Sequence, residues 1–135
     1  MSTTTQVSIP IGLLHADLTD QIIAAAIEVH RALGPGLLES AYEECLCYEL
    51  GLRELPYCRQ VSLPVRYKAI ILPVGYRMDL VVADNVVVEI KSVDALERIH
   101  EVQLVTYLRL SGKRVGLLIN FNVPLLRNGI VRRVL

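Results

Sequence analysis

Residues 75–93 read GYRMDLVVADNVVVEIKSV, and this stretch decides the fold. Residues 76–82 and 86–91 are rich in Val, Leu and Tyr, which favour strands. Asp84 and Asn85 separate them with the residue types that are typical of tight turns. The sequence therefore predicts two antiparallel strands joined by a short turn.

Glu89 and Lys91 lie on the second of these strands. Side chains alternate along a strand, so Glu89 and Lys91 share one face while the apolar Val88 and Ile90 take the other. Charged groups on a strand that otherwise resembles core are costly unless they are paired or bound to a metal. This pattern indicates a site for chemistry, whereas a plain Glu–Lys pair on an exposed sheet face is the structural alternative.

The length of the turn decides where Asp79 lies relative to Glu89. We expect a loop of three residues, Ala83, Asp84 and Asn85, which places Asp79 directly opposite Glu89. A two-residue loop would put the two acids on opposite faces unless a bulge intervened. Two carboxylates about 5 Å apart repel each other without a cation, and Mg²⁺ takes oxygen ligands of this kind.

The rest of the chain predicts an α/β protein in which residues 61–91 form a three-stranded antiparallel meander. The expected order is α-α-β-β-β-α-β, with a possible final strand. The first helix ends at a Gly-Pro-Gly sequence, and residues 115–121 are apolar on both faces, which is typical of a central strand. The expected helices cover residues 17–33, 37–50 and 95–110, and the expected strands cover residues 61–67, 76–82, 86–91, 115–121 and 130–134.

The third helix carries polar groups on the face that is expected to be buried. Its i, i+3, i+4 stripe contains Leu96, Ile99, Gln103, Tyr107 and Leu110. A buried glutamine needs hydrogen-bond partners, which a polar active site or a nearby backbone group supplies. Glu39 lies in the first turn of the second helix, where a carboxylate also complements the helix dipole.

Length and composition limit the number of domains and the class of protein. The chain has 135 residues, 53% of them hydrophobic, and we expect a loosely ordered lead-in over residues 1–16 followed by one domain over residues 17–135. The apolar surplus favours a homodimer interface. Charged residues interrupt every apolar stretch, no signal peptide is evident, and the three cysteines have no C-x-x-C spacing. A cytoplasmic protein that does not enter the membrane is expected.

Fourteen basic and fourteen acidic residues give the chain no net charge, so charge alone does not indicate nucleic-acid binding. A nuclease would need a local basic patch. The candidates near the C-terminus are Lys113, Arg114, Arg127, Arg132 and Arg133, although such clusters usually decorate a solvated surface.

Several blocks of sequence resemble a known family. GLLESAY at residues 36–42 matches the G-x-x-E-x-x-Y signature, and EVHRALGPGLLESAYEECL, GYRMDLVV, VVVEIKSV, QLVTYL and GLLINFN follow in order. Over residues 22–135 the chain resembles the GxxExxY protein family. That family is placed in the PD-(D/E)XK nuclease superfamily, whose restriction-endonuclease-like core is a mixed β-sheet flanked by helices in the order αβββαβ.

The resemblance implies roles for individual residues. Glu39 corresponds to a helix-borne acid, Asp79 to a metal ligand, and Glu89 with Lys91 to the (D/E)-x-K element. Met78 departs from the pattern, because it stands where the superfamily name has proline.

RecB-like members of the superfamily supply two further correspondences. Gln103 and Tyr107 match their Q-x-x-x-Y element, and His30 takes the place of their helical histidine as a further candidate metal ligand. A lone histidine on an apolar helix stripe is, however, more often a core residue with a satisfied hydrogen bond.

Together these correspondences imply a metal-dependent nuclease that hydrolyses phosphodiester bonds of nucleic acid, DNA rather than RNA. Asp79, Glu89 and Glu39 would hold Mg²⁺ or Mn²⁺. Two alternatives stay open at this point. One is a catalytically inactive nuclease-fold module that binds nucleic acid or a protein partner. The other is a structural homodimer whose acidic residues form a solvated patch, and acids on opposite faces of the sheet would favour it.

Overall fold

The structure is a computed structural model that describes residues 12 and 14–135. Most of the expected lead-in over residues 1–16 lies outside the described residues. The first helix, α1 (Ala16–Leu33), begins one residue before the expected helix and ends with it. Among the described residues, none of the helices combines the length and apolar character that crossing a membrane requires.

Helices and strands follow the expected order with two additional short strands. The remaining helical segments are α2 (Glu39–Leu52), α3 (Arg98–Ser111) and the 3-10 helix η2 (Leu126–Gly129). The strands are β1 (Tyr57–Ser62), β2 (Val65–Tyr67), β3 (Ile70–Leu72), β4 (Arg77–Val82), β5 (Val86–Lys91), β6 (Val115–Asn120) and β7 (Ile130–Val134).

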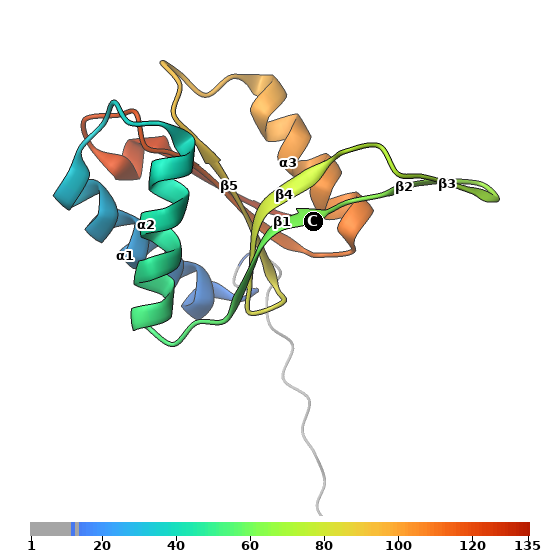
Figure 1. Cartoon of the computed structure of the whole chain (residues 1–135), viewed down its shortest axis with the longest axis horizontal. Helices are drawn as coiled ribbons and strands as arrows, with labels where there is room; N and C mark the ends of the chain where they lie inside the picture. Colours follow the sequence, from blue (N-terminus) through green and yellow to red (C-terminus); the bar gives the residue numbers. More distant parts are fainter. Residues whose placement is uncertain (1–11, 13) are drawn as a thin grey trace, which may run out of the picture.

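Five strands form one mixed sheet in the order β1-β4-β5-β6-β7. Strands β5 and β6 run parallel, and the other neighbouring pairs are antiparallel. Helices α1 and α2 cover one face of the sheet, and α3 covers the other (Figure 1). The predicted α/β architecture is confirmed, and β6 is buried along its whole length, as expected for a strand between two others.

The first strand differs from the prediction. The sequence predicts one strand over residues 61–67, whereas β1 begins at Tyr57 and ends at Ser62. Pro64 cannot donate a backbone hydrogen bond to the ladder, so pairing with β4 stops there. The chain continues into β2 and β3, which pair with each other and form a separate two-stranded sheet.

The buried stripe of α3 also differs from the prediction. Ile99 is 63% exposed and Leu110 is 37% exposed, so neither belongs to the core. The buried residues of α3 are Leu104, Tyr107 and Leu108. The helix therefore faces the sheet with a stripe rotated slightly from the expected one, and the half-buried Gln103 lies at its margin.

Helix α3 approaches β6 closely at Gly116. A Cβ atom on Gly116 would lie 2.7 Å from Cδ1 and 3.1 Å from Cγ of the fully buried Leu104. The absence of a side chain here lets the helix lie directly on the sheet.

Substitution at Gly116 tests this contact. Gly116→Ala should lower the free energy of unfolding by about 1–3 kcal/mol, because the Leu104 side chain has to move within a filled core. Denaturant-induced unfolding measures the change. Gly51→Ala in α2 is the matched control: no atom lies within 4 Å of its added Cβ, so it should stabilise the protein by up to about 1 kcal/mol. Equal effects of the two changes would contradict the packing account.

Candidate active site at the fork between β4 and β5

Strands β4 and β5 part at Asp79 and Glu89, and we call this point the fork. Pairing runs from Val82↔Val86 to Leu80↔Val88, so the connecting loop has three residues, as predicted. Continuing this register places Asp79 opposite Glu89. At this position the ladder ends in side chains: the Asp79 N–H donates to Oε1 of Glu89 at 3.1 Å, and the Ile90 N–H donates to Oδ2 of Asp79 at 2.8 Å. Each acid thus accepts a hydrogen bond from the strand opposite.

Strand β4 also turns at Asp79. Leu80 packs in the cluster beneath α1 and α2, whereas Met78 packs in the cluster beneath α3. Residues two apart in a regular strand share a face, so the strand changes orientation between them. Gln60 of β1, which lies opposite Asp79 in the register, has a left-handed backbone with φ of 50°. The turn therefore places Asp79 at the boundary between the two faces of the sheet.

Burial raises the pKa of both acids of the fork. Glu89 is 5% exposed, and burial, followed by the negative charge of Asp79, raises its pKa to about 9. Burial also raises the pKa of Asp79, although the hydrogen bond from Ile90 opposes this shift. The charge of Lys91 lowers both pKa values but does not offset burial. The fork therefore favours a proton or a cation between the two carboxylates.

Helix α3 covers the fork from one side. Tyr107 is 6% exposed in the cluster beneath α3, and its hydroxyl accepts a hydrogen bond from Nε2 of Gln103 at 2.9 Å. Burial, followed by the charge of Glu89, raises the pKa of Tyr107, so the phenol stays protonated at neutral pH. Gln103 and Tyr107 thus form a pair of neutral hydrogen-bonding groups, and Tyr107 lies close enough to Glu89 to sense its charge.

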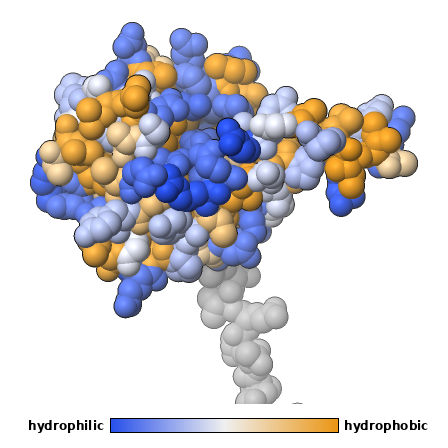
Figure 2. Space-filling view, in the orientation of Figure 1, coloured by the Kyte–Doolittle hydropathy of each residue, from blue (hydrophilic) through white to orange (hydrophobic). Residues whose placement is uncertain are grey.

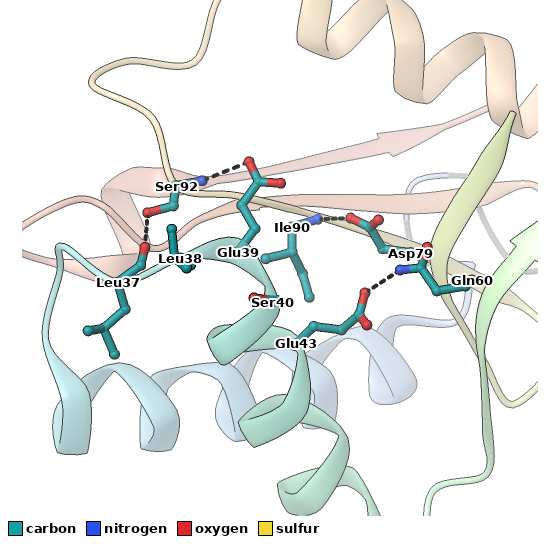
Figure 3. A pocket seen from close by; sticks show the side chains of 9 residues that line it. All are labelled: Leu37, Leu38, Glu39, Ser40, Glu43, Gln60, Asp79, Ile90 and Ser92. Atoms are coloured by element: carbon teal, nitrogen blue, oxygen red, sulfur yellow. Dashed lines mark hydrogen bonds between the residues drawn. The ribbon is translucent and has the colours of Figure 1, made fainter. Parts of the chain in front are cut away.

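Helix α2 approaches the fork from the other side, with Glu39 as its first residue. The Ser92 N–H donates to Oε1 of Glu39 at 3.4 Å, and Oγ of Ser92 donates to the Leu37 carbonyl at 2.6 Å. The start of α2 is thereby joined to the residue that follows β5. Glu39 and Asp79 line one cavity of about 560 Å³ from opposite sides (Figure 3).

Glu43 is a further acid of this cavity that sequence reasoning missed. It is 8% exposed, and its carboxylate accepts hydrogen bonds from Nη2 of Arg59 and Nε2 of Gln60, both at 2.8 Å. Figure 3 shows the bond from Gln60. It lies one helical turn after Glu39, and this i, i+4 spacing was the available signal. Glu43 thus joins α2 to β1 at the residue opposite Asp79.

The structure does not bring His30 to this cavity. Its Nε2 lies 2.7 Å from the Val123 carbonyl, and its ring packs at a tilt against Phe121. His30 is therefore a core residue with a satisfied hydrogen bond, which is the structural alternative given above for a histidine on an apolar helix stripe.

Tyr42 of the G-x-x-E-x-x-Y signature has a structural role. Its ring stacks on Phe121 with centroids 4.4 Å apart. Its hydroxyl donates to the Gly34 carbonyl at 2.6 Å and accepts from the Leu37 N–H at 3.1 Å. Tyr42 thus holds the connection from α1 to α2 immediately before Glu39.

The fork offers two carboxylates, and carboxylate oxygens are the ligands that a hard cation such as Mg²⁺ prefers. Among the described residues, no three His, Cys, Asp or Glu side chains are arranged so that they could hold a metal ion by themselves. Mg²⁺, however, is usually bound through one or two carboxylates together with water and substrate phosphates. Asp79 and Glu89 supply two such carboxylates, and Glu39 lines the same cavity as Asp79.

The family comparison agrees with this geometry. A family model described as PD-(D/E)XK nuclease superfamily matches residues 16–134. The chain belongs to the PD-(D/E)XK nuclease superfamily. Membership implies a hydrolase of nucleic acid, and nucleases of this superfamily typically use divalent metal ions. The GxxExxY family within it stays a prediction. Comparison with curated proteins and with solved structures gives no significant match in either case.

The raised pKa of Glu89 makes the stability of this PD-(D/E)XK protein depend on pH. Its folded-state pKa of about 9 exceeds the ordinary value of 4.5, so the folded protein keeps a proton that the unfolded chain releases. Without metal, stability should therefore fall as pH rises from about 4.5 to about 9.

Glu89→Gln should remove most of this loss, because the amide can still accept from the Asp79 N–H and carries no charge. Thermal unfolding in EDTA should find the variant more stable than wild type at pH 8, with the difference shrinking toward pH 5. A variant that is less stable than wild type at pH 8 would show that Glu89 is ionised and well accommodated in the metal-free protein.

Tyr42→Phe tests the support of α2. The change leaves the Gly34 carbonyl and the Leu37 N–H without their partner, which should cost about 1–3 kcal/mol of unfolding free energy. Tyr48→Phe on the same helix is the control, because Tyr48 is 69% exposed and its change should stay within about 0.5 kcal/mol. Denaturant unfolding of both variants gives the comparison, and matching losses would refute the role given to Tyr42.

Proposed function

We propose that the protein is a metal-dependent nuclease that hydrolyses phosphodiester bonds of nucleic acid, DNA rather than RNA. The observation that supports this most is the pairing of Asp79 with Glu89 at the fork, where each carboxylate accepts a backbone hydrogen bond from the other strand. This pairing holds two acids together in a mostly buried place. Burial and then the charge of Asp79 raise the pKa of Glu89, and a divalent cation held by the two carboxylates would offset their repulsion.

In this proposal Asp79 and Glu89 hold Mg²⁺ or Mn²⁺, and Glu39 contributes directly or through water. A bound cation of this kind lowers the pKa of water and offsets the negative charge of a phosphate. Lys91 follows Glu89 by two residues on β5, and its charge reaches both acids of the fork. Its ammonium group positions the attacking water and stabilises negative charge that develops on the phosphate.

Gln103 and Tyr107 complete the proposed site from α3. Their mutual hydrogen bond keeps the amide and the phenol together, and both groups are neutral donors at physiological pH. We propose that they contact the substrate phosphate or orient Lys91. Neutral donors suit this place because further negative charge beside Glu89 would be costly.

Cleavage of plasmid and oligonucleotide substrates in Mg²⁺ or Mn²⁺ tests the proposed activity. Asp79→Asn and Lys91→Ala should each lower the rate about a hundredfold or more. Asp84→Asn is the matched control, because it removes a carboxylate from the exposed turn of the same hairpin, where Asp84 pairs with Lys113. Wild-type protein that cleaves no faster than Asp79→Asn across single-stranded, duplex and RNA substrates would overturn the proposal.

An inactive module that binds nucleic acid or a protein partner is the second candidate. It is favoured by the finding that no three acidic, His or Cys side chains are arranged to hold a metal among the residues that the structure describes. Calorimetric titration separates the two candidates. The nuclease should bind Mn²⁺ and lose this binding in Glu89→Ala, whereas the module should bind nucleic acid without affinity for the cation.

We also propose that the protein acts in the cytoplasm as a homodimer. The apolar composition of the chain supports this, together with exposed large side chains on and just before α2, namely Leu38, Tyr48 and Leu52. Sedimentation equilibrium measures the oligomeric state directly.

A further inference from the structure

Strands β2 and β3 and the segments that join them to the sheet form an arm over residues 63–76. The arm continues from the end of the β1–β4 ladder, which runs past the fork to Ser62↔Arg77. It projects away from the rest of the molecule (Figure 1). Strand β4 begins at Arg77, directly after the arm, and carries Asp79 two residues further on, so the base of the arm lies next to the fork.

The charge of this part of the chain is one-sided. Residues 55–78 contain four of the fourteen basic residues and none of the fourteen acidic ones. Arg59 pairs with Glu43 and Glu44 of α2, whereas Arg66, Lys68 and Arg77 are exposed along the arm and at its base. In a chain without net charge, this is a local positive surface that complements a polyanion.

Aromatic and aliphatic side chains are interleaved with these cations. Tyr67 is 57% exposed and Tyr76 is 49% exposed, and Ile70 and Ile71 are both 53% exposed. Figure 2 shows apolar side chains on the surface of the arm. Exposed aromatic rings among basic residues are the combination with which proteins stack nucleic-acid bases while they contact the phosphates.

The tip of the arm places a lysine where glycine would be favoured. Lys68 begins the turn between β2 and β3 with φ of 52°, a conformation that L side chains rarely adopt. Its ammonium group lies 5.3 Å from the centre of the Tyr67 ring. A strained residue at an exposed tip is a reason to look for a function of its side chain.

We propose that the arm binds nucleic acid and delivers it to the fork. Arg66 and Lys68 contact phosphates, and Tyr67 stacks on a base. The inference rests on the proposed function in taking nucleic acid as the substrate, and it assigns the binding element. A two-stranded ribbon also fits the major groove of B-DNA, so single strands and duplexes share the chemistry that the arm recognises. A second copy of this chain is a poorer occupant, because two such arms would bring cations together without acids.

The test measures binding separately from cleavage. Fluorescence anisotropy of labelled DNA in EDTA, single-stranded and duplex, compares wild type with Arg66→Ala/Lys68→Ala. The double variant should bind at least tenfold more weakly at low salt, and the slope of log affinity against log salt should fall by about 1–2. Arg31→Ala/Arg53→Ala is the matched control, because Arg31 lies on α1 and Arg53 directly follows α2. Both residues are exposed and far from the arm, so the change should leave affinity unchanged.

Two single variants separate binding from folding. Lys68→Gly should weaken binding without lowering the melting temperature, because glycine relieves the left-handed turn. Tyr67→Ala should weaken binding to single strands about fivefold or more, and a larger loss for single strands than for duplexes would identify base stacking.

Each outcome decides the matter. If wild type binds DNA and the arm variants bind like the control pair, the arm inference falls while the nuclease proposal stands. If binding depends on the arm but no substrate is cleaved, the arm inference stands and the nuclease proposal falls. If Tyr67→Ala dissociates a dimer and leaves DNA affinity unchanged, the arm contacts protein and the inference is overturned. Wild type that binds neither form of DNA would overturn it as well.

Discussion

Two carboxylates end a β-ladder in this protein, and the candidate site depends on them. Asp79 and Glu89 each accept a backbone N–H from the opposite strand where another backbone carbonyl would continue the ladder. Their hydrogen bonds satisfy the backbone N–H groups of Asp79 and Ile90, but they bring two acids together in a place where water is largely excluded. Both carboxylates therefore have hydrogen-bond donors, whereas no neighbouring positive charge fully compensates their negative charges. This electrostatic deficit gives the fork its capacity to hold a cation.

The rest of the fold brings other groups to the fork from both faces of the sheet. Helix α3 lies close on β6, because Gly116 has no side chain, and it places Tyr107 beside the buried acid. Helix α2 places Glu39 at the opposite side, held by Ser92 and by the hydroxyl of Tyr42. In the G-x-x-E-x-x-Y signature Glu39 thus lines the cavity. Tyr42 fixes the connection from α1 to α2, which precedes Glu39 in the chain.

The central hairpin could be predicted because its signals are local. Alternation and the three-residue turn place Asp79 opposite Glu89, and burial follows from the apolar neighbours. The i, i+4 spacing from Glu39 places Glu43 on the same face of α2, but its contact with Gln60 could not be predicted. That contact depends on the left-handed backbone of Gln60 in β1 and on how α2 packs over the sheet. The arm was missed because its apolar residues resemble those of a core strand, although Pro64 marks where the sheet ends. Likewise, Ile99 is exposed because α3 is rotated about its axis relative to the expected orientation. The spacing of apolar residues defines the buried face of a helix only coarsely.

The central claim is that Asp79 and Glu89 form the cation-binding centre of the protein. Anomalous diffraction from crystals soaked in Mn²⁺ tests it most directly, because the position of the ion is seen without any assumption about the substrate. The account predicts one dominant anomalous peak at the fork, in contact with oxygen atoms of both residues and on the side of the cavity that Glu39 lines. Peaks only at other acidic residues, or carboxylates of Asp79 and Glu89 that face apart in those crystals, would contradict it.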